Sequence, residues 1–127
     1  MKFAVQLYSV RDHINNGDDM LEILGKVKEI GFDGVEFAGI FDYTAQEVKK
    51  MCADIGLVPV SAHIPFVDMM ADPEGTISTY KEIGCEQVVI PYLLPEFRPG
   101  AERFDEIIEG AKVLGEVCKK LGMTLAY

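Results

Sequence analysis

Hydrophobic residues along the chain alternate between two kinds of segment, and the joints between these segments repeat. Four times, apolar residues at helical spacing end in an aliphatic residue and a glycine, and a β-branched run follows within a few positions. Glycine takes the left-handed conformation that ends many helices without the steric cost of a side chain. We therefore predict a helix-to-strand joint at each of these glycines, which are Gly31, Gly56, Gly84 and Gly122.

Helix start signals complete the pattern. Asp18 and Asp19 are predicted to cap the first helix. Thr44, with Glu47 three residues later, forms a capping box for the second. Pro73 presets a turn ahead of the third helix. The predicted helices span residues 18–30, 45–55, 76–83 and 102–121.

Five short runs are predicted as strands, and we expect them to be apolar on both faces. That composition is typical of parallel strands covered by helices. The runs span residues 3–8, 34–37, 58–63, 87–90 and 124–127. After the third run, residues 66–70 are predicted to form a flexible apolar loop that serves as a lid or a contact surface.

The repeated order of strand and helix is used by two α/β architectures. An open doubly wound parallel sheet fits 127 residues, whereas a closed TIM (βα)8 barrel typically takes about 250. Two patterns favour the barrel: the chain stops inside its fifth apolar run, and polar or aromatic residues follow the strand ends, where barrels build active sites. We therefore predict a single domain over residues 1–127 with the fold of the N-terminal half of a TIM barrel. It would contain four βα units and the start of a fifth strand, and the open doubly wound sheet is the alternative.

Charge and composition exclude several classes of function. The chain has 21 acidic and 12 basic side chains, a formal net charge of −9, and no basic stripe of the kind that nucleic-acid binding requires. No apolar run approaches the roughly 18 to 20 residues of a membrane span, and no secretion signal precedes the first strand. We therefore expect a cytoplasmic location. The cysteines Cys52, Cys85 and Cys118 lie far apart on apolar segments and are predicted to be buried thiols.

Three stretches carry a more specific signal. Residues 5–12 read VQLYSVRD, residues 31–36 read GFDGVE, and residues 62–65 read AHIP. Together they resemble the first half of the xylose isomerase-like TIM-barrel superfamily, and most closely its sugar phosphate isomerase/epimerase branch, over nearly the whole chain. The first stretch is fairly distinctive, whereas the other two are shared more widely in the superfamily and support the fold better than any one substrate.

The resemblance implies metal-assisted isomerisation or epimerisation of a small sugar or polyol. The implied ion is Mn or Mg, sometimes Zn or Co, and it polarises a carbonyl and a neighbouring hydroxyl while carboxylates move a proton through an enediolate. The family's metal ligands come from strands five to eight, so none is carried over to a residue of this chain. We therefore expect the 127 residues to be inactive alone and to hold no complete metal site.

By the same resemblance, the chain supplies one wall of the substrate pocket. Glu36 is the sharpest candidate, because a carboxylate within an apolar strand is costly unless it binds a ligand or has a buried partner. The alternative is that it faces a helix and pairs with a lysine. His63, at a strand end, either has a functional role, as a substrate-binding residue, a metal ligand or a proton donor, or is a satisfied structural residue. The full set of expected substrate-binding residues is Tyr8, Arg11, Glu36, His63 and Tyr92.

The remaining candidates also have structural alternatives. Tyr8 and Tyr92 either contact a sugar or belong to the core with a solvated hydroxyl. Arg11 either binds a phosphate or carboxylate through its guanidinium or pairs with a neighbouring acid at the surface. His13 and Asp68 are interpreted as solvated side chains in polar or loop segments.

Three functional hypotheses follow. In the first, the chain is part of an isomerase-like barrel and needs a second half for activity. In the second, it is a self-associating half-barrel, natural or engineered, that pairs through its open sheet edges with a second copy or another half-barrel. In the third, it is a small doubly wound signalling or binding module. A receiver-like signalling module is disfavoured because the strand ends at Tyr8 and His63 lack the acids of a receiver domain. A zinc endonuclease for abasic DNA, from a related branch, is disfavoured by the net charge and by Tyr92, where that branch has a second histidine.

Overall fold

The computed structural model describes residues 1–127 and contains a single five-stranded parallel sheet. The strand order in the sheet, β1-β2-β3-β4-β5, is the order in the chain, so each strand pairs with its sequence neighbours. Helical segments connect successive strands. The strands are β1 (Ala4–Gln6), β2 (Gly34–Phe37), β3 (Val58–His63), β4 (Gln87–Val89) and β5 (Thr124–Ala126).

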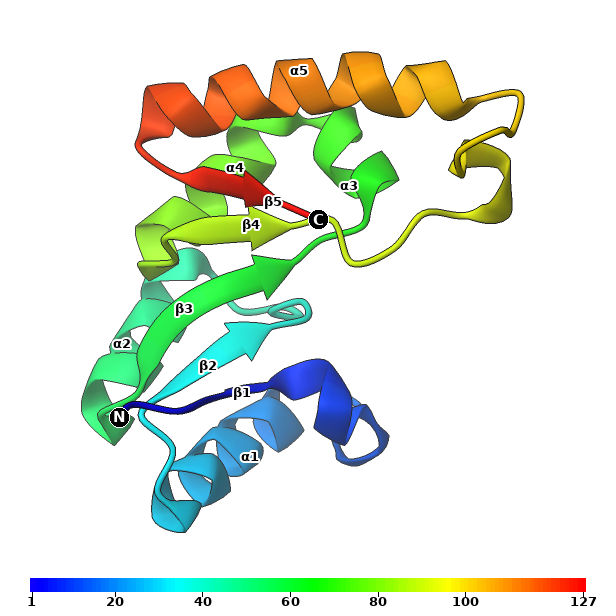
Figure 1. The fold of residues 1–127 in the computed structure, drawn as a ribbon. Coiled ribbons are helices and arrows are strands. Elements are labelled where there is room, and N and C mark those ends of the chain that lie inside the picture. The colour runs from blue at the N-terminus through cyan, green and yellow to red at the C-terminus, as the bar shows by residue number, and fades with distance from the viewer.

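The longer helices lie along one side of the curved sheet (Figure 1). The strand order never reverses, as it does in a doubly wound sheet, so that alternative architecture is wrong. None of the helices combines the length and the hydropathy that crossing a membrane requires. The α-helices are α1 (Gly17–Ile30), α2 (Ala45–Ile55), α3 (Phe66–Ala71), α4 (Pro73–Ile83) and α5 (Phe104–Leu121), and the 3₁₀ helices are η1 (Leu7–His13) and η2 (Pro95–Phe97).

All four predicted glycine joints are confirmed. The backbone angle φ is 109° at Gly31, 81° at Gly56, 113° at Gly84 and 66° at Gly122, which places each glycine in the left-handed region. Each glycine N–H donates to a carbonyl of the last helical turn. The joints thus stop each helix at a defined residue and return the chain to the sheet.

The helix starts differ from the prediction in two places. Asn16 caps α1, because its side-chain oxygen accepts a hydrogen bond of 2.9 Å from the Asp19 N–H. Asp18 and Asp19 lie in the first turn instead, where negative charge complements the helix dipole. Pro73 is the first residue of α4 rather than part of a preceding turn, and Asp72 is its N-cap. The capping box predicted for α2 is confirmed.

The end of the first predicted strand and the predicted loop after β3 are both short helices. The first strand ends at Gln6, and the chain then turns into η1 instead of continuing extended to Tyr8. The segment expected to be a flexible loop after β3 forms α3, in which Phe66 and Met69 are buried. Three-residue spacing puts these two side chains on one helical face, so their burial stabilises the helix.

The two faces of the sheet differ sharply in polarity. Val35, Phe37, Ala62 and Val88 have no exposed surface and form the layer beneath the helices. On the opposite face, each strand contributes one polar side chain to a single row across the sheet, which the strand register aligns. The prediction of strands that are apolar on both faces is therefore wrong, because only one face is covered by helices. The polar row consists of Gln6, Glu36, Ser61, Gln87 and Thr124.

The three cysteines, Cys52, Cys85 and Cys118, lie in the hydrophobic core, which is a cluster of 26 buried residues. All three thiols are free and buried, which confirms the prediction. Burial raises the pKa of Cys52 to about 11 and the pKa of Cys85 to about 12. Because the thiolate is the reactive form, these cysteines are inert near neutral pH and serve as small apolar residues.

Gly110 and Gly115 of α5 provide a matched test of this packing. A Cβ at Gly110 would clash with Cζ of Phe66, whereas a Cβ at Gly115 would meet nothing within 4 Å. We expect Gly110→Ala to lower the free energy of unfolding by about 1–3 kcal/mol, because the buried Phe66 ring must move. Gly115→Ala should raise it by about 0.5–1 kcal/mol through the higher helix propensity of alanine. Urea denaturation measures both, and stabilisation by both substitutions would contradict the contact between α3 and α5.

Candidate functional site

The carboxyl-terminal halves of β1, β2 and β3 bring four polar side chains together. Gln6 ends β1, Glu36 lies in β2 and Ser61 lies in β3, and the sheet register places these three side by side. His63 ends β3 two residues after Ser61 and therefore points to the same face. Parallel strands end at one edge of the sheet, which is why residues 57 positions apart in the sequence meet here. We call these four residues the polar cluster.

Glu36 is the centre of the polar cluster. Its carboxylate accepts hydrogen bonds from the Gln6 amide at 3.0 Å and from the Ser61 hydroxyl at 2.5 Å. Nε2 of His63 lies 3.0 Å from the same carboxylate, and the Gln6 amide nitrogen lies 2.7 Å from Nδ1 of His63. The same amide nitrogen lies 3.0 Å from Nε2 of His63. An imidazole with its proton on Nε2 can donate to Glu36 and accept from Gln6 through Nδ1. The side chains of His63 and Glu36 are 22% and 21% exposed, so the cluster is accessible from solvent.

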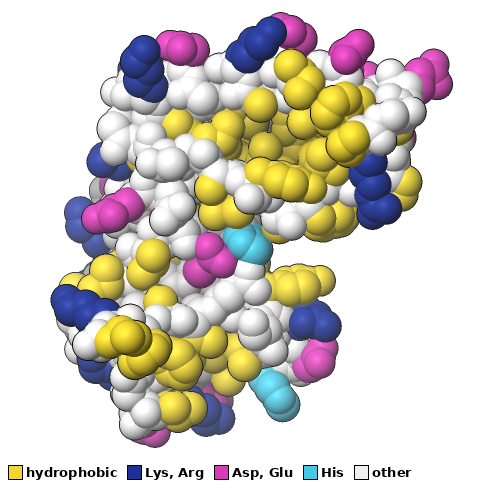
Figure 2. All heavy atoms as spheres, viewed as in Figure 1, with side chains coloured by type: hydrophobic (Ala, Val, Ile, Leu, Met, Phe, Trp, Pro, Cys, Tyr) yellow, Lys and Arg dark blue, Asp and Glu magenta, His cyan; other side chains and the backbone are white.

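A cavity of about 580 Å³ opens beside the polar cluster. Figure 2 shows the molecule hollowed between the part built from β1 and α1 and the part built from β5 and α5. The volume lies within the range of about 300–1,000 Å³ that is usual for small-molecule sites. The polar and aromatic side chains that line this cavity, the main cavity below, are Gln6, Tyr8, His63, Asp68, Tyr80 and Tyr92.

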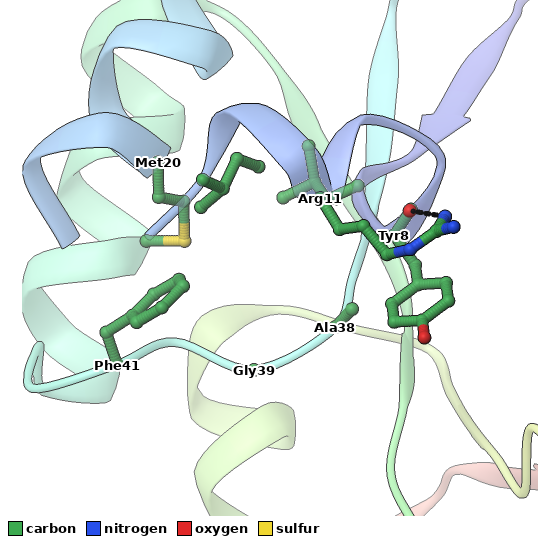
Figure 3. A pocket seen from close by; sticks show the side chains of 8 residues that line it. Tyr8, Arg11, Met20, Ala38, Gly39 and Phe41 are labelled. Carbon is green, nitrogen blue, oxygen red and sulfur yellow. Dashed lines mark hydrogen bonds between the residues drawn. The ribbon is translucent and has the colours of Figure 1, made fainter. Parts of the chain in front are cut away.

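Arg11 lies in a smaller neighbouring cavity of about 150 Å³ (Figure 3). Its guanidinium donates a hydrogen bond of 3.0 Å to the carbonyl of Tyr8 and stands 4.6 Å from the centroid of the Tyr8 ring. Tyr8 lines both cavities and thus forms part of the wall between them. Arg11 therefore contacts Tyr8 rather than the neighbouring acid considered from the sequence. His13, two residues further along η1, is exposed as predicted.

The structure brings most of the predicted pocket residues to one place. Tyr8, His63 and Tyr92 line the main cavity, and Glu36 contacts His63 from within the sheet. The alternative for Glu36, a lysine on a helix, is wrong because its partners belong to β1 and β3. Arg11 does not line the main cavity. A substrate-binding role for these five residues stays a prediction.

Four residues of this region are absent from the sequence-based prediction of the site. Gln6 and Ser61 could have been found by strand alternation, since they occupy the same face as Glu36. Asp68 is predicted as a solvated loop charge, but it lies in α3 and lines the main cavity. Tyr80 reaches that cavity from α4, and helical spacing alone indicates only that it is buried. The four are Gln6, Ser61, Asp68 and Tyr80.

The residues of this chain do not fit a metal ion. No group of three or more His, Cys, Asp or Glu side chains lies close enough together to hold one. Glu36 and His63 do lie together, but they are only two ligands, and no third His, Cys, Asp or Glu side chain joins them. The divalent ion that the resemblance implies therefore has no ligand set here.

Solved structures of similar fold cover nearly the whole chain. A sugar phosphate isomerase/epimerase from Parabacteroides distasonis matches with a TM-score of 0.76 and 21% identity, over 98% of this chain and 49% of its own. A family 2 AP endonuclease from Brucella melitensis matches with a TM-score of 0.71 and 20% identity, over 98% and 53%. A xylose isomerase-like TIM barrel protein from Mycobacterium smegmatis, in complex with magnesium, matches with a TM-score of 0.70 and 17% identity, over 98% and 53%. No protein-family model and no curated protein sequence matches the chain.

The chain has the fold of half a TIM barrel, the fold of the xylose isomerase-like barrel structures that it matches. At these levels of identity the similarity establishes the fold, and it confirms the barrel prediction over the doubly wound alternative. The half-barrel spans about half the length of the solved structures it matches. Its polar cluster lies toward the carboxyl ends of the strands, the face at which TIM barrels carry their active sites.

Glu36 and Glu22 provide a matched test of the polar cluster. Glu36→Ala removes the acceptor of the Ser61 hydroxyl, and Ser61 is only 4% exposed. Leaving a buried donor without a partner should lower the free energy of unfolding by about 1–3 kcal/mol. Glu22→Ala breaks only an exposed pair with Lys26 and should cost less than about 0.5 kcal/mol. Urea denaturation compares the two, and equal losses would show that the cluster does not help to hold the strands together.

Proposed function

We propose that this half-barrel forms one wall of the substrate pocket of a sugar isomerase or epimerase. It would bind and orient the hydroxyl groups of a small sugar or polyol without carrying out the reaction alone. The observation that carries the proposal is the polar cluster beside the main cavity, at the carboxyl end of the sheet. The fold shared with the Parabacteroides distasonis sugar phosphate isomerase/epimerase supports it.

The chemistry of the wall suits a polyhydroxy ligand. Glu36 accepts hydrogen bonds, Gln6 donates them, and the His63 imidazole does both. A sugar hydroxyl also donates and accepts, so adjacent hydroxyls can pair with neighbouring members of this set. Tyr8 and Tyr92, which are 56% and 57% exposed, add ring faces and phenol groups at the cavity.

The chemical step is assigned to residues outside this chain. A structure of similar fold holds magnesium, and we propose that a divalent ion acts in the complete enzyme. The residues described here do not fit that ion, so no step of the proposal passes through it. This chain contributes substrate binding and orientation only.

A nuclease is the weaker candidate, although an AP endonuclease shares the fold. The net charge is −9, and the main cavity is lined by Asp68 with no lysine or arginine. A DNA backbone requires cations that replace its counterions. The sugar pocket therefore agrees better with the charges of this chain.

We also propose a cytoplasmic location. All three cysteines are free and buried. Free thiols are usual in the reducing cytoplasm, whereas small secreted domains commonly contain disulfides.

Self-association is a second candidate function, favoured by the open edges of the sheet. β1 and β5 each pair with only one neighbouring strand. Unpaired backbone groups on such edges can pair with another chain. Beside β5 lies an apolar cavity of about 390 Å³ lined by Ile90, Leu93, Phe104, Leu125 and Tyr127, among others, and Figure 2 shows a broad hydrophobic area below α5. We propose that a second copy covers this area in a two-fold symmetric dimer.

Binding of D-fructose tests the sugar-pocket proposal. We expect the 127-residue chain to bind D-fructose without converting it, with NMR signal changes at His63, Tyr8 and Tyr92. His63→Ala should weaken binding about fivefold, since one hydrogen bond is worth about 1 kcal/mol. His13→Ala changes the other histidine, which is exposed outside the cavity, and should leave binding unchanged. The proposal is wrong if saturating D-fructose shifts no signal at the cavity.

Light scattering coupled to size-exclusion chromatography tests self-association. We expect a dimer, and we expect Tyr127→Glu to shift it toward monomer by placing a charge in the apolar area beside β5. Tyr127 is 79% exposed, so the substitution should not disturb the fold. Val113→Glu adds the same charge at an exposed position of α5 that does not line this cavity and should leave the dimer intact. A wild-type chain that stays monomeric at high concentration would refute the dimer.

A further inference from the structure

We infer that the main cavity selects an uncharged polyhydroxy ligand over its phosphorylated form, and that Tyr80 and Asp68 belong to the selecting wall. The inference rests on the proposed function and deepens it by naming the substrate class. Tyr80 comes from α4 and Asp68 from α3, so neither belongs to the polar cluster. Both line the main cavity.

Tyr80 has a hydroxyl group for which the fold supplies no partner. The residue is 8% exposed, and its ring is packed in the hydrophobic core. Every fully buried polar side-chain atom has a hydrogen-bond partner, and none of the hydrogen bonds of the chain involves the Tyr80 hydroxyl. The small exposed part of Tyr80 therefore includes this hydroxyl, and it opens onto the cavity that Tyr80 lines. A buried aromatic residue with its only polar atom at a cavity is well placed to bond to a ligand.

Tyr80 and Asp68 together offer a donor and an acceptor. Burial raises the pKa of Tyr80 to about 12, and the negative charge of nearby Asp68 contributes to that rise. The phenol therefore keeps its proton at physiological pH and donates. Asp68 is exposed, and its carboxylate accepts. A ligand hydroxyl can accept a hydrogen bond from the Tyr80 phenol and donate one to the Asp68 carboxylate.

The charges around the cavity oppose a phosphate group. Its lining contains Asp68 and no lysine or arginine, and Glu36 lies behind His63. Arg11 lies in the smaller cavity, where it bonds to the backbone of Tyr8 and stacks against its ring. Phosphate recognition generally uses cationic donors, above all the arginine fork. A phosphorylated ligand would meet negative charge here without such a donor.

Competition between two forms of one sugar tests the inference. In low salt, NMR titration of the 127-residue chain should give at least tenfold weaker binding for D-fructose 6-phosphate than for D-fructose. Repulsion between a phosphate dianion and one carboxylate roughly 7 Å away, in a dielectric near that of water, should lower the affinity about fivefold to tenfold. Asp68→Asn should therefore reduce the ratio of the two affinities about fivefold. Salt should reduce the ratio in the wild type as well.

Two further variants separate the hydroxyl from general charge effects. Tyr80→Phe keeps the buried ring and removes the hydroxyl, and it should weaken the binding of D-fructose about fivefold. Glu82→Gln removes one negative charge from α4 at an exposed residue outside the cavity, and it should leave the affinity ratio unchanged. If Tyr80→Phe fails to fold, the ratio of the affinities for D-fructose and D-fructose 6-phosphate, measured with Asp68→Asn, still tests the inference.

The outcomes distinguish this inference from the function on which it rests. If D-fructose binds but the phosphorylated sugar binds equally well, the inference is overturned and the proposed function stands. The same holds if the ratio does not change in Asp68→Asn, or if a folded Tyr80→Phe binds D-fructose like the wild type. If D-fructose does not bind to the wild-type cavity, the proposed function fails and the inference fails with it.

Discussion

Side chains alternate between the two faces of the sheet, and helices cover only one of these faces. The other features depend on this constraint, which is interrupted once, where the pairing of β2 with β3 shifts register between Val35 and Glu36. One set of positions must be apolar because it lies under α1, α2, α4 and α5, and Val35, Phe37, Ala62 and Val88 are completely buried there. The other set lies on the face without helices, and one residue of it from each strand forms a polar row across the sheet. Burial and polarity are thus separated across a single layer of backbone.

This separation creates the polar cluster. A carboxylate in the middle of a sheet needs partners, and Glu36 receives them from the strands on either side. The same contacts orient His63, whose ring lies at the boundary between the polar row and the main cavity. The cavity is completed by the segments that follow β1, β2, β3 and β4 and by Tyr80 of α4. The fold therefore places rigid hydrogen-bonding groups beside aromatic side chains, an arrangement suited to small polar ligands.

Local signals in the sequence predict the architecture well. A glycine that ends a helix acts through its own backbone, so the joints at Gly31, Gly56, Gly84 and Gly122 could be placed to the residue. The start of α1 was harder to predict, because Asn16, Asp18 and Asp19 are all suitable caps and only the path of the chain decides between them. The sequence after β3 indicates only an apolar loop, because its helical face becomes evident only against the core that lies beneath it. Glu36 and His63 stand out locally, the first as a charge within an apolar strand and the second as an imidazole at a strand end.

The sequence by itself determined the order of the elements, their joints and the presence of polar groups at the strand ends, because these depend on neighbours within a few residues. The tertiary structure alone decided which groups meet. Gln6 and His63 are 57 residues apart and are joined by strand register, and Tyr80 reaches the cavity from a helix that the sequence marks only as amphipathic. It also decided that Arg11 contacts Tyr8 in a separate cavity. Such contacts depend on the curvature of the sheet and on the position of each helix against it. Both follow from the packing of the whole chain.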